Sequence, residues 1–225
     1  AQDALIKARL DALLRQEAEE DAVTRQLARI RRRGELPIGK TADLVEEALK
    51  APLDRMFELY AESTARWPHM LEDVDFQHSQ TICGQVVRVQ GRITQRRQGG
   101  GDGCRIELSS SNLLEEKRYR RDKLLGAWVQ HLASHVDGRP ITTVVIGKNG
   151  KAQINPLTAE DAKRYFGTLV EAYVEGLCAP LPLAARTGFA WLEKSGTACA
   201  GALADGHQPA VAAARAKYED GYDRK

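Results

Sequence analysis

A segment near the middle of the chain alternates small or apolar residues with polar ones, and this pattern constrains the fold more than any other. Between residues 87 and 94 the odd positions hold Val, Val, Gly and Ile, whereas the even positions hold Arg, Gln, Arg and Thr. Because successive side chains of a β-strand point to opposite faces, this period of two predicts a strand with one buried face. We expect the glycine-rich segment 96–103 to turn the chain back into a second strand over 104–110.

Segments with helical periodicity flank these strands. Apolar residues recur every three or four positions in residues 5–30, 44–60, 124–132 and 165–177, which predicts amphipathic helices, the last of them N-capped by Thr158. Residues 141–146 are rich in β-branched side chains and predict a further strand, and Asn149-Gly150 predicts a type I′ turn after it. With 225 residues the chain is long enough for one large or two small domains, and this mixture of elements predicts an α/β fold.

The overall charge and the cysteines exclude few functions by themselves. The formal net charge of +2 at pH 7 is too small to indicate a nucleic-acid partner unless the basic residues cluster. Four cysteines lie far apart without a Cys-x-x-Cys pair, and no secretory leader precedes them, so we expect reduced thiols and a cytoplasmic protein. No apolar run approaches the length of a bilayer, so no membrane-spanning segment is expected.

Two segments, 82–90 and 104–112, read as neighbouring strands of a metal-dependent nuclease that has lost its metal ligands. An active enzyme of this type carries an Asp soon after a Gly on the first strand and an acidic-x-Lys triplet on the second, so that two carboxylates hold Mg²⁺ and the Lys assists the attacking water. The matching positions here are Val87, Leu108 and Ser110, which cannot supply those groups. We therefore predict no catalytic residue, no bound metal and no cofactor.

Glu107 is the one acid inside the second of these segments. Strand alternation predicts it on the face opposite Leu108, together with Arg105 and Ser109. Only a β-bulge would shift that register, and even then no Lys stands two residues later. A surviving nuclease site centred on Glu107 is the alternative hypothesis.

Residues 34–41, Gly-Glu-Leu-Pro-Ile-Gly-Lys-Thr, satisfy the G-x-x-x-x-G-K-[ST] pattern of a phosphate-binding loop. Such a loop follows a buried strand, so that its backbone N–H groups and the next helix converge on the phosphates. Here a basic helical segment precedes the pattern, Pro37 lacks an N–H, and no apolar strand ending in Asp follows. Nucleotide binding is a second alternative, which this context disfavours.

His131 and His135 lie four residues apart on one predicted helix, which is a spacing that suits zinc ligands. No Glu occupies the place that it has in H-E-x-x-H, and no third ligand is apparent. We therefore interpret the pair as part of a polar helix face.

Basic residues concentrate on the first predicted strand, in its loop and after the second strand. Arg side chains with the interleaved Tyr119 suit phosphate contact and base stacking. Glu115, Glu116 and Asp122 lie among them, so a solvated surface of balanced charge is an equally good interpretation. The candidate DNA-binding residues are Arg88, Arg92, Arg96, Arg97, Lys117, Arg118, Arg120 and Arg121.

Residues 155–183 and 188–192 resemble the C-terminal region of the RecC family, the gamma chain of exodeoxyribonuclease V. Residues 32–39 resemble the linker that leads into that region, and residues 214–222 resemble a segment near its end. The resemblance covers nearly the whole chain. Its longest block is specific, whereas the linker piece is shared with RecB-type proteins.

The resemblance implies a restriction-endonuclease-like fold of the PD-(D/E)XK type, catalytically degenerate and with added helices. We accordingly divide the chain into a helical lead-in and linker over residues 1–40, an inactive nuclease-like domain over 41–192 and an Ala-rich C-terminal helical extension over 193–225. The resemblance also implies that Lys40-Thr41 completes the phosphate-loop pattern by accident.

In function, the resemblance implies a noncatalytic part of a DNA helicase–nuclease that processes double-strand breaks for recombinational repair. The implied partners are the RecB and RecD subunits, a double-stranded DNA end and the separated strands. For this portion of the family, docking of RecD and guidance of a DNA strand are expected. The alternatives are an active RecB-type nuclease and a P-loop nucleotide-binding protein.

Overall fold

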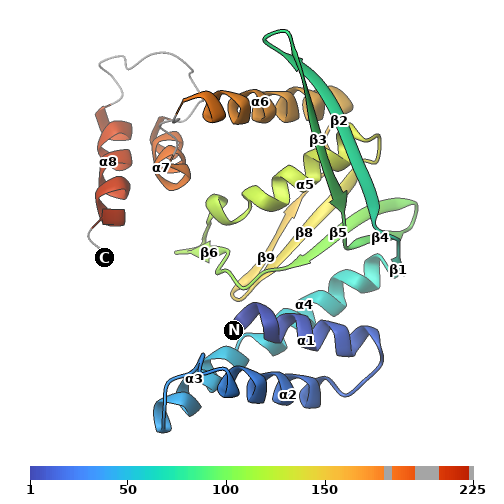
Figure 1. The fold of residues 1–225 in the computed structure, drawn as a ribbon, viewed down its shortest axis with the longest axis vertical. Coiled ribbons are helices and arrows are strands. Elements are labelled where there is room, and N and C mark those ends of the chain that lie inside the picture. The colour runs from blue at the N-terminus through green and yellow to red at the C-terminus, as the bar shows by residue number, and fades with distance from the viewer. Residues whose placement is uncertain (180–183, 196–207, 223–225) are drawn as a thin grey trace.

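A five-stranded mixed sheet with helices on both faces forms the centre of the molecule (Figure 1). The computed structural model describes residues 1–179, 184–195 and 208–222. The helices are α1 (Gln2–Leu14), α2 (Glu19–Arg32), α3 (Lys40–Lys50), α4 (Leu53–Arg66), α5 (Leu125–Val136), α6 (Ala159–Cys178), α7 (Ala185–Ser195) and α8 (Gln208–Tyr222), with one 3₁₀ turn, η1 (Arg121–Lys123). The strands are β1 (His69–Met70), β2 (Val74–Ile82), β3 (Gln85–Ile93), β4 (Arg96–Gly99), β5 (Asp102–Leu108), β6 (Leu114–Glu115), β7 (Arg118–Tyr119), β8 (Ile141–Gly147) and β9 (Gly150–Ile154).

Helices α1 to α4 cover one face of the central sheet. Helix α2 buries Val23, Leu27 and Ile30, which lie on one side because they follow the spacing of a helix. These residues share one buried cluster with Ile106 and Val144 of the sheet. The N-terminal helices therefore belong to the same core as the sheet.

Strands β5 and β8 lie parallel in the middle of the sheet, and α5 connects them. The strand order is β1-β4-β5-β8-β9, and Ile106 stands opposite Val144. All seven residues of β8 are buried, as expected for a strand that helices cover on both faces. Helix α5 packs on the second face, where Ala127 joins a cluster with Val145. The α/β class is confirmed.

The turn between β8 and β9 lies one residue earlier than the sequence predicts. Gly147 pairs with Gly150, so the turn residues are Lys148 and Asn149. Neither of them has a positive φ angle, so the prediction of a type I′ turn is wrong. The side chain of Asn149 accepts a hydrogen bond from the backbone N–H of Leu113, a tertiary contact that no local pattern contains.

Strands β2 and β3 form a separate two-stranded ribbon that stands over α5 and α6 (Figure 1). Its turn is Cys83-Gly84, whose φ angles of 49° and 78° are typical of a two-residue hairpin turn. Phe76 and Ile93 on the inner face share a buried cluster with Phe166 of α6. The ribbon is thus anchored by its inner face.

This ribbon shows that residues 82–90 and 104–112 are not neighbouring strands, so that prediction is wrong. Strand β3 pairs with β2, whereas β5 pairs with β4 and β8. The hairpin expected in the glycine-rich segment does form, but it joins β4 to β5. A positive φ of 59° at Gln95 ends β3 before β4 begins, and a Gln gives no sequence signal for that conformation.

No helix in the described ranges is both long enough and apolar enough to span a membrane. Cys83, Cys104 and Cys178 are free thiols, and Cys199 lies outside the described residues. The Ala-rich extension contributes α8.

Candidate nucleic-acid interface

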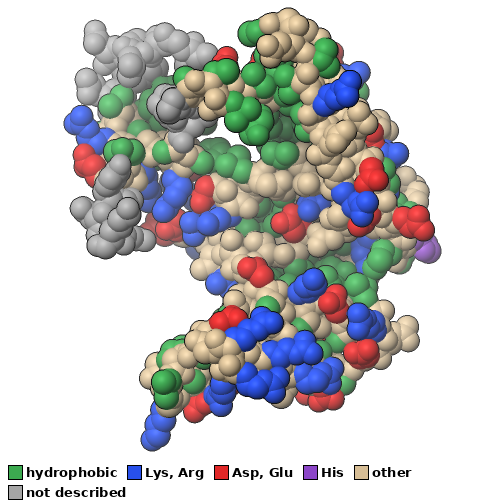
Figure 2. Space-filling view, viewed as in Figure 1, with side chains coloured by type: hydrophobic (Ala, Val, Ile, Leu, Met, Phe, Trp, Pro, Cys, Tyr) green, Lys and Arg blue, Asp and Glu red, His purple; other side chains and the backbone are tan. Residues whose placement is uncertain are grey.

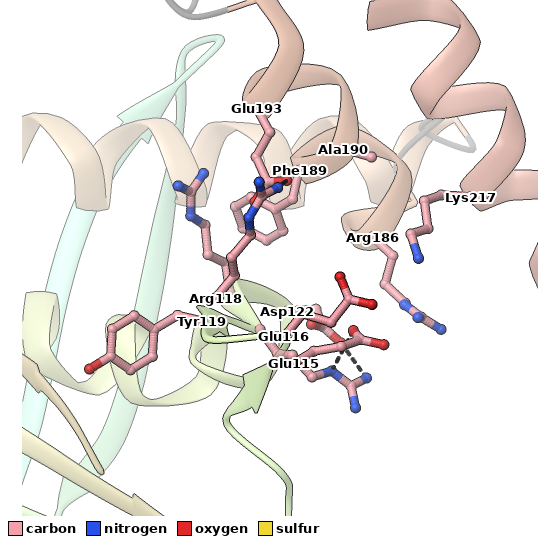
Figure 3. A pocket seen from close by; sticks show the side chains of 12 residues that line it. Glu115, Glu116, Arg118, Tyr119, Asp122, Arg186, Phe189, Ala190, Glu193 and Lys217 are labelled. Carbon is pink, nitrogen blue, oxygen red and sulfur yellow. Dashed lines mark hydrogen bonds and ion pairs between the residues drawn. The ribbon is translucent and has the colours of Figure 1, made fainter. Parts of the chain in front are cut away.

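The exposed basic residues that follow β5 gather on a small hairpin. Strands β6 and β7 pair with each other, and η1 follows them directly. Helices α7 and α8 stand beside this hairpin and enclose with it a hollow of about 240 Å³ (Figure 3). The basic residues that line the hollow are Arg118, Arg120, Arg121, Arg186 and Lys217.

Acidic side chains share this hollow. Arg118 Nη1 lies 3.9 Å from Glu193 Oε2, and Arg120 Nη2 lies 3.4 Å from Asp122 Oδ2. In the described part of the chain, Arg121 makes no ion pair. The hollow therefore carries both signs of charge, with the guanidinium of Arg121 unpaired and available to an anion.

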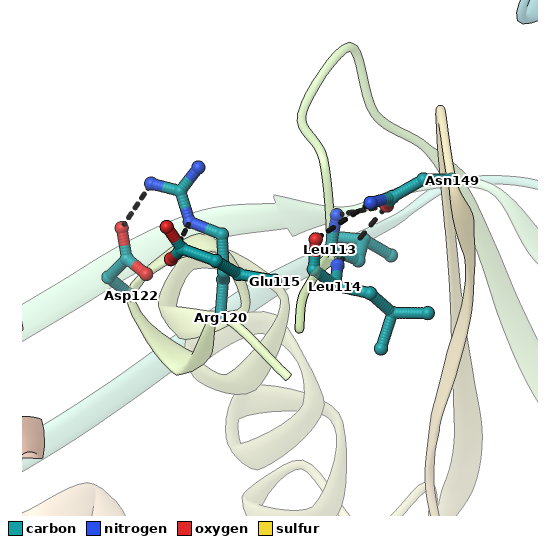
Figure 4. A network of polar contacts seen from close by, with 6 residues as sticks. All are labelled: Leu113, Leu114, Glu115, Arg120, Asp122 and Asn149. Atoms are coloured by element: carbon teal, nitrogen blue, oxygen red, sulfur yellow. Dashed lines mark hydrogen bonds and ion pairs between the residues drawn. The ribbon is translucent and has the colours of Figure 1, made fainter. Parts of the chain in front are cut away.

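Asn149 holds the hairpin in place from the turn between β8 and β9. Its Oδ1 accepts hydrogen bonds from the N–H groups of Leu113 and Leu114 at 2.8 and 3.1 Å, and its Nδ2 donates to the Leu114 carbonyl at 2.7 Å (Figure 4). The Tyr119 hydroxyl donates to the Lys151 carbonyl at 3.1 Å. Four hydrogen bonds thus attach the hairpin to the central sheet, which makes it a defined surface rather than a loose loop.

The structure separates the eight predicted DNA-binding residues into three places. Four of them lie on the hairpin and η1, and the other four lie on β3 and β4. On β3, Arg88 and Arg92 are exposed on the outer face of the ribbon. Arg92 Nε lies 2.8 Å from Asp75 Oδ1, and this hydrogen bond raises the pKa of Arg92. Arg88 makes no ion pair among the described residues.

Arg97 lies inside the protein, which sequence reasoning did not foresee. Only 9% of the residue is exposed. Its Nη1 donates to the Trp67 carbonyl at 3.2 Å and its Nη2 to the Tyr60 hydroxyl at 3.2 Å. Its neighbour Arg96 donates to the Glu72 carbonyl at 2.8 Å, and burial lowers the pKa of Arg96. Both guanidinium groups are hydrogen-bonded to nearby oxygen atoms of the protein, and Arg97 is too buried to contact a phosphate.

The positions matched to nuclease ligands also lie apart. Val87 packs against the buried cluster of Phe76, Ile93 and Phe166. Leu108 packs against the other cluster, which the N-terminal helices share with Ile106 and Val144. Glu107 stands opposite Val145 on the other face of the sheet, as strand alternation predicts, and accepts a hydrogen bond from Arg105 Nη1 at 2.7 Å. Within the described ranges, no three His, Cys, Asp or Glu residues are grouped so as to hold a metal ion.

His131 and His135 are buried, with 0% and 4% exposure, so the polar helix face that we predicted is in fact interior. His131 Nδ1 lies 2.9 Å from Thr143 Oγ1. His135 Nε2 accepts the N–H of Leu157 at 3.1 Å, and its Nδ1 donates to the His131 carbonyl at 2.8 Å. Burial lowers the pKa of His131 to about 4. Both ring nitrogens of His135 are occupied by protein partners, which leaves none for a metal.

The phosphate-loop pattern of residues 34–41 joins two helices, α2 and α3, instead of a strand and a helix. Gly39, with a φ of 76°, precedes the first turn of α3. The element before the segment is α2 and not a buried strand, and Ile38 within the segment is 98% exposed. The expected mismatch of context is confirmed, because a phosphate loop needs a strand before it.

Sequence reasoning missed two basic residues of the hollow, Arg186 on α7 and Lys217 on α8. Both lie far along the chain from the hairpin, so no spacing could have joined them to it. Figure 2 shows a further gathering of Lys and Arg side chains over α1 and α2. Arg29, Arg31 and Arg32 in the last turn of α2 contribute to the basic character of that layer.

Comparison with known proteins places the chain in a family. The RecBCD enzyme subunit RecC of Escherichia coli (strain K12) is 25% identical over 212 residues, which make up 94% of this chain and 17% of that protein. The chain thus spans less than a fifth of the length of this curated relative. A solved structure described as the crystal structure of SSO0001 covers 73% of this chain and 76% of its own, with 14% identity and a TM-score of 0.37, and so weak a likeness supports no conclusion. The family model of the RecC C-terminal domain matches residues 1–196, and the chain therefore belongs to the RecC C-terminal domain family.

Proposed function

We propose that this chain is a noncatalytic domain of a cytoplasmic RecBCD-type helicase–nuclease, in which it docks a RecD-type subunit and contacts DNA. The family match supports the proposal that the protein acts in a DNA-repair complex. The observation that carries the docking role is an exposed apolar surface on α5 and α6. The hairpin of β6 and β7 supplies the candidate DNA contact.

The noncatalytic assignment is supported by the surroundings of the acid nearest to a nuclease position. Glu107 is hydrogen-bonded to Arg105, whose side chain is only 7% exposed. A carboxylate held by a buried guanidinium is a poor ligand for a second cation, because that cation would be repelled at short range. The mixed sheet with the β5–α5–β8 unit is consistent with a degenerate PD-(D/E)XK-type fold, which is part of this proposal.

Among the residues that the structure describes, helix α6 has an apolar face whose side chains remain exposed. Its exposed members recur every four residues, and two further exposed apolar residues lie on α5, whose Trp128 ring is 6.0 Å from that of Tyr165 on α6. Each of these side chains belongs to a residue that is between 37% and 69% exposed. We call the following set the apolar stripe: Leu125, Val129, Tyr165, Leu169, Tyr173 and Leu177. A contiguous exposed apolar surface of this kind marks a protein–protein contact.

The docking role is tested with the RecD-type subunit of the same complex. Changing both Tyr173 and Leu177 to Glu places two charges on the apolar stripe, and we expect the affinity for that subunit to fall at least tenfold. Changing Ala159 and Thr168, which are neutral and exposed on α6 outside the stripe, to Glu adds the same two charges and is the matched control. Equal losses in both variants, or unchanged affinity in the stripe variant, would contradict docking at this face.

The DNA contact is tested through its dependence on salt. Each phosphate contact contributes about 0.7 to 0.9 to the slope of log K against log salt concentration. Changing Lys117, Arg118 and Arg121 to Ser should therefore flatten the slope by roughly 2 to 3. The matched control removes the same charge from another layer, by changing Arg29, Arg32 and Arg33 of the α2 end to Ser. An unchanged slope in the hairpin variant would contradict DNA binding at the hairpin of β6 and β7.

A further inference from the structure

The ribbon of β2 and β3 has two open edges. Each strand is nine residues long, and the two strands pair with each other over their full length. Within the ranges that the structure describes, neither strand forms a backbone hydrogen bond to any segment outside the ribbon. An anchored strand with unpaired backbone groups is a template for the addition of another strand.

The turn determines which backbone groups point outwards. A two-residue turn makes Ile82 and Gln85 a hydrogen-bonded pair, and such pairs recur at every second position along an antiparallel ribbon. The N–H and C=O groups of the intervening residues therefore face away from the ribbon. On β3 these residues are Val86, Arg88, Gln90 and Arg92, and on β2 they are Asp75, Gln77, Ser79 and Thr81.

The edge of β3 has apolar surface left to bury. The side chains of Val87 and Val89 on the inner face are only partly buried beside the cluster of Phe76, Ile93 and Phe166, whereas Val86, 65% exposed, lies on the outer face with Arg88. Trp128 of α5 joins the same cluster, and its ring lies 6.0 Å from that of Tyr165, a member of the apolar stripe. The apolar surface thus continues from β3 across α5 to the stripe. A strand added to β3 would cover it with its inward side chains.

The charge on this edge favours one class of partner. Arg88 is exposed and makes no ion pair among the described residues, and Arg92 is paired within the ribbon to Asp75. Joining two copies of this edge would bring like charges together, which disfavours a second copy of this chain. An incoming strand with acidic residues on its outer face would be attracted by Arg88.

We propose that β3 accepts an extended segment of a partner subunit, with alternating apolar and acidic residues, as the third strand of the ribbon. This inference rests on the proposed docking of a partner subunit and specifies how one part of that partner binds. The backbone groups of Arg88 and Gln90 form the ladder, and the apolar residues of the segment pack on Val87, Val89 and the adjoining stripe.

Gln77 and Gln90 allow a matched test, because they stand opposite each other in the ribbon and both point their backbone N–H groups outwards. Gln90→Pro removes an outward donor from β3, and Gln77→Pro removes the equivalent donor from β2. In the complex assembled with its RecB- and RecD-type subunits, we expect Gln90→Pro to weaken subunit binding at least tenfold and Gln77→Pro to change it less than twofold.

Amide hydrogen exchange of the unmodified protein provides the second measurement. On assembly of the complex, exchange at Arg88 and Gln90 should slow at least tenfold, while exchange at Gln77 and Ser79 stays as in the free chain. Strand addition would be overturned if the two proline variants had equal effects. It would also be overturned if the β3 amides stayed unprotected in a complex that the Tyr173 and Leu177 variant disrupts, and this second result would leave the proposed docking intact. Absence of any complex would overturn both.

Discussion

Arg105 donates a hydrogen bond from Nη1 to the carboxylate of Glu107, two residues along the same strand, at 2.7 Å. The guanidinium side chain is 7% exposed, whereas that of Glu107 is 30% exposed. The pair therefore lies at the margin of the core. Its loss has consequences for stability that can be separated from any question of catalysis.

Changing Glu107 to Ala should lower the free energy of unfolding by about 2 kcal/mol, because it leaves a buried guanidinium without its anion. The double change of Arg105 to Met and Glu107 to Leu removes both charges and should cost less than the single change. Denaturant unfolding of both variants measures the difference. A single variant as stable as the double one would show that the pair contributes no buried charge interaction.

Gly99 lies where β4 passes the end of α4, and this close approach requires a glycine. A Cβ atom there would come 2.2 Å from the Arg66 carbonyl oxygen and 2.9 Å from the Trp67 Cα. Since both are backbone atoms, Gly99→Ala should lower the free energy of unfolding by about 3 kcal/mol. Gly91→Ala is the control, because nothing lies within 4 Å of the added atom. Thermal unfolding should show a large shift for the first variant alone.

His131 makes the stability depend on pH between its folded and unfolded pKa values. Burial, followed by the nearby His135, lowers the pKa of His131 to about 4 from 6.5. The unfolded chain therefore binds more protons than the folded one in this window. Stability is full above about pH 6.5 and falls as the pH drops towards 4, by up to roughly 3 kcal/mol. His131→Gln should flatten this slope in urea titrations at successive pH values, and a slope equal to that of the unmodified protein would contradict it.

Asn149→Ala should detach the hairpin of β6 and β7 from the sheet, because three hydrogen bonds to the backbone of Leu113 and Leu114 are lost. The expected cost is about 1 to 2 kcal/mol of stability, since the hydrogen bond to Leu113 is partly buried and the two to Leu114 are exposed. Amide exchange should accelerate at Leu114 but not at Ala152 in the centre of β9. Equal acceleration at both sites would indicate general unfolding instead of release of the hairpin.

The sequence predicted the elements that depend on local pattern. The helices α1 to α6, the buried strand over residues 141–146 and the cap at Thr158, which accepts the Asp161 N–H at 3.1 Å, follow from periodicity or capping chemistry, whereas α7 was not predicted. These features need only residues that are close in the chain. The α/β class follows from them.

Strand pairing could not be predicted in the same way. Residues of β3 and β5 alternate alike, and periodicity does not state which partner each strand has. The burial of Arg97 is a consequence of pairing, since β4 places this residue opposite the buried Cys104. The contributions of Arg186 and Lys217 depend on how α7 and α8 pack, which no spacing encodes.

Strand β8, with every residue covered, separates the molecule into two compartments. The helices α1 to α4 lie on one side, and the apolar stripe on α5 and α6 lies on the other. A close-packed partition of this kind does not deform gradually under small forces. Partners that bind to the two sides of the sheet should consequently bind with additive free energies. Substitutions on one side should then leave the affinity of a partner on the opposite side unchanged.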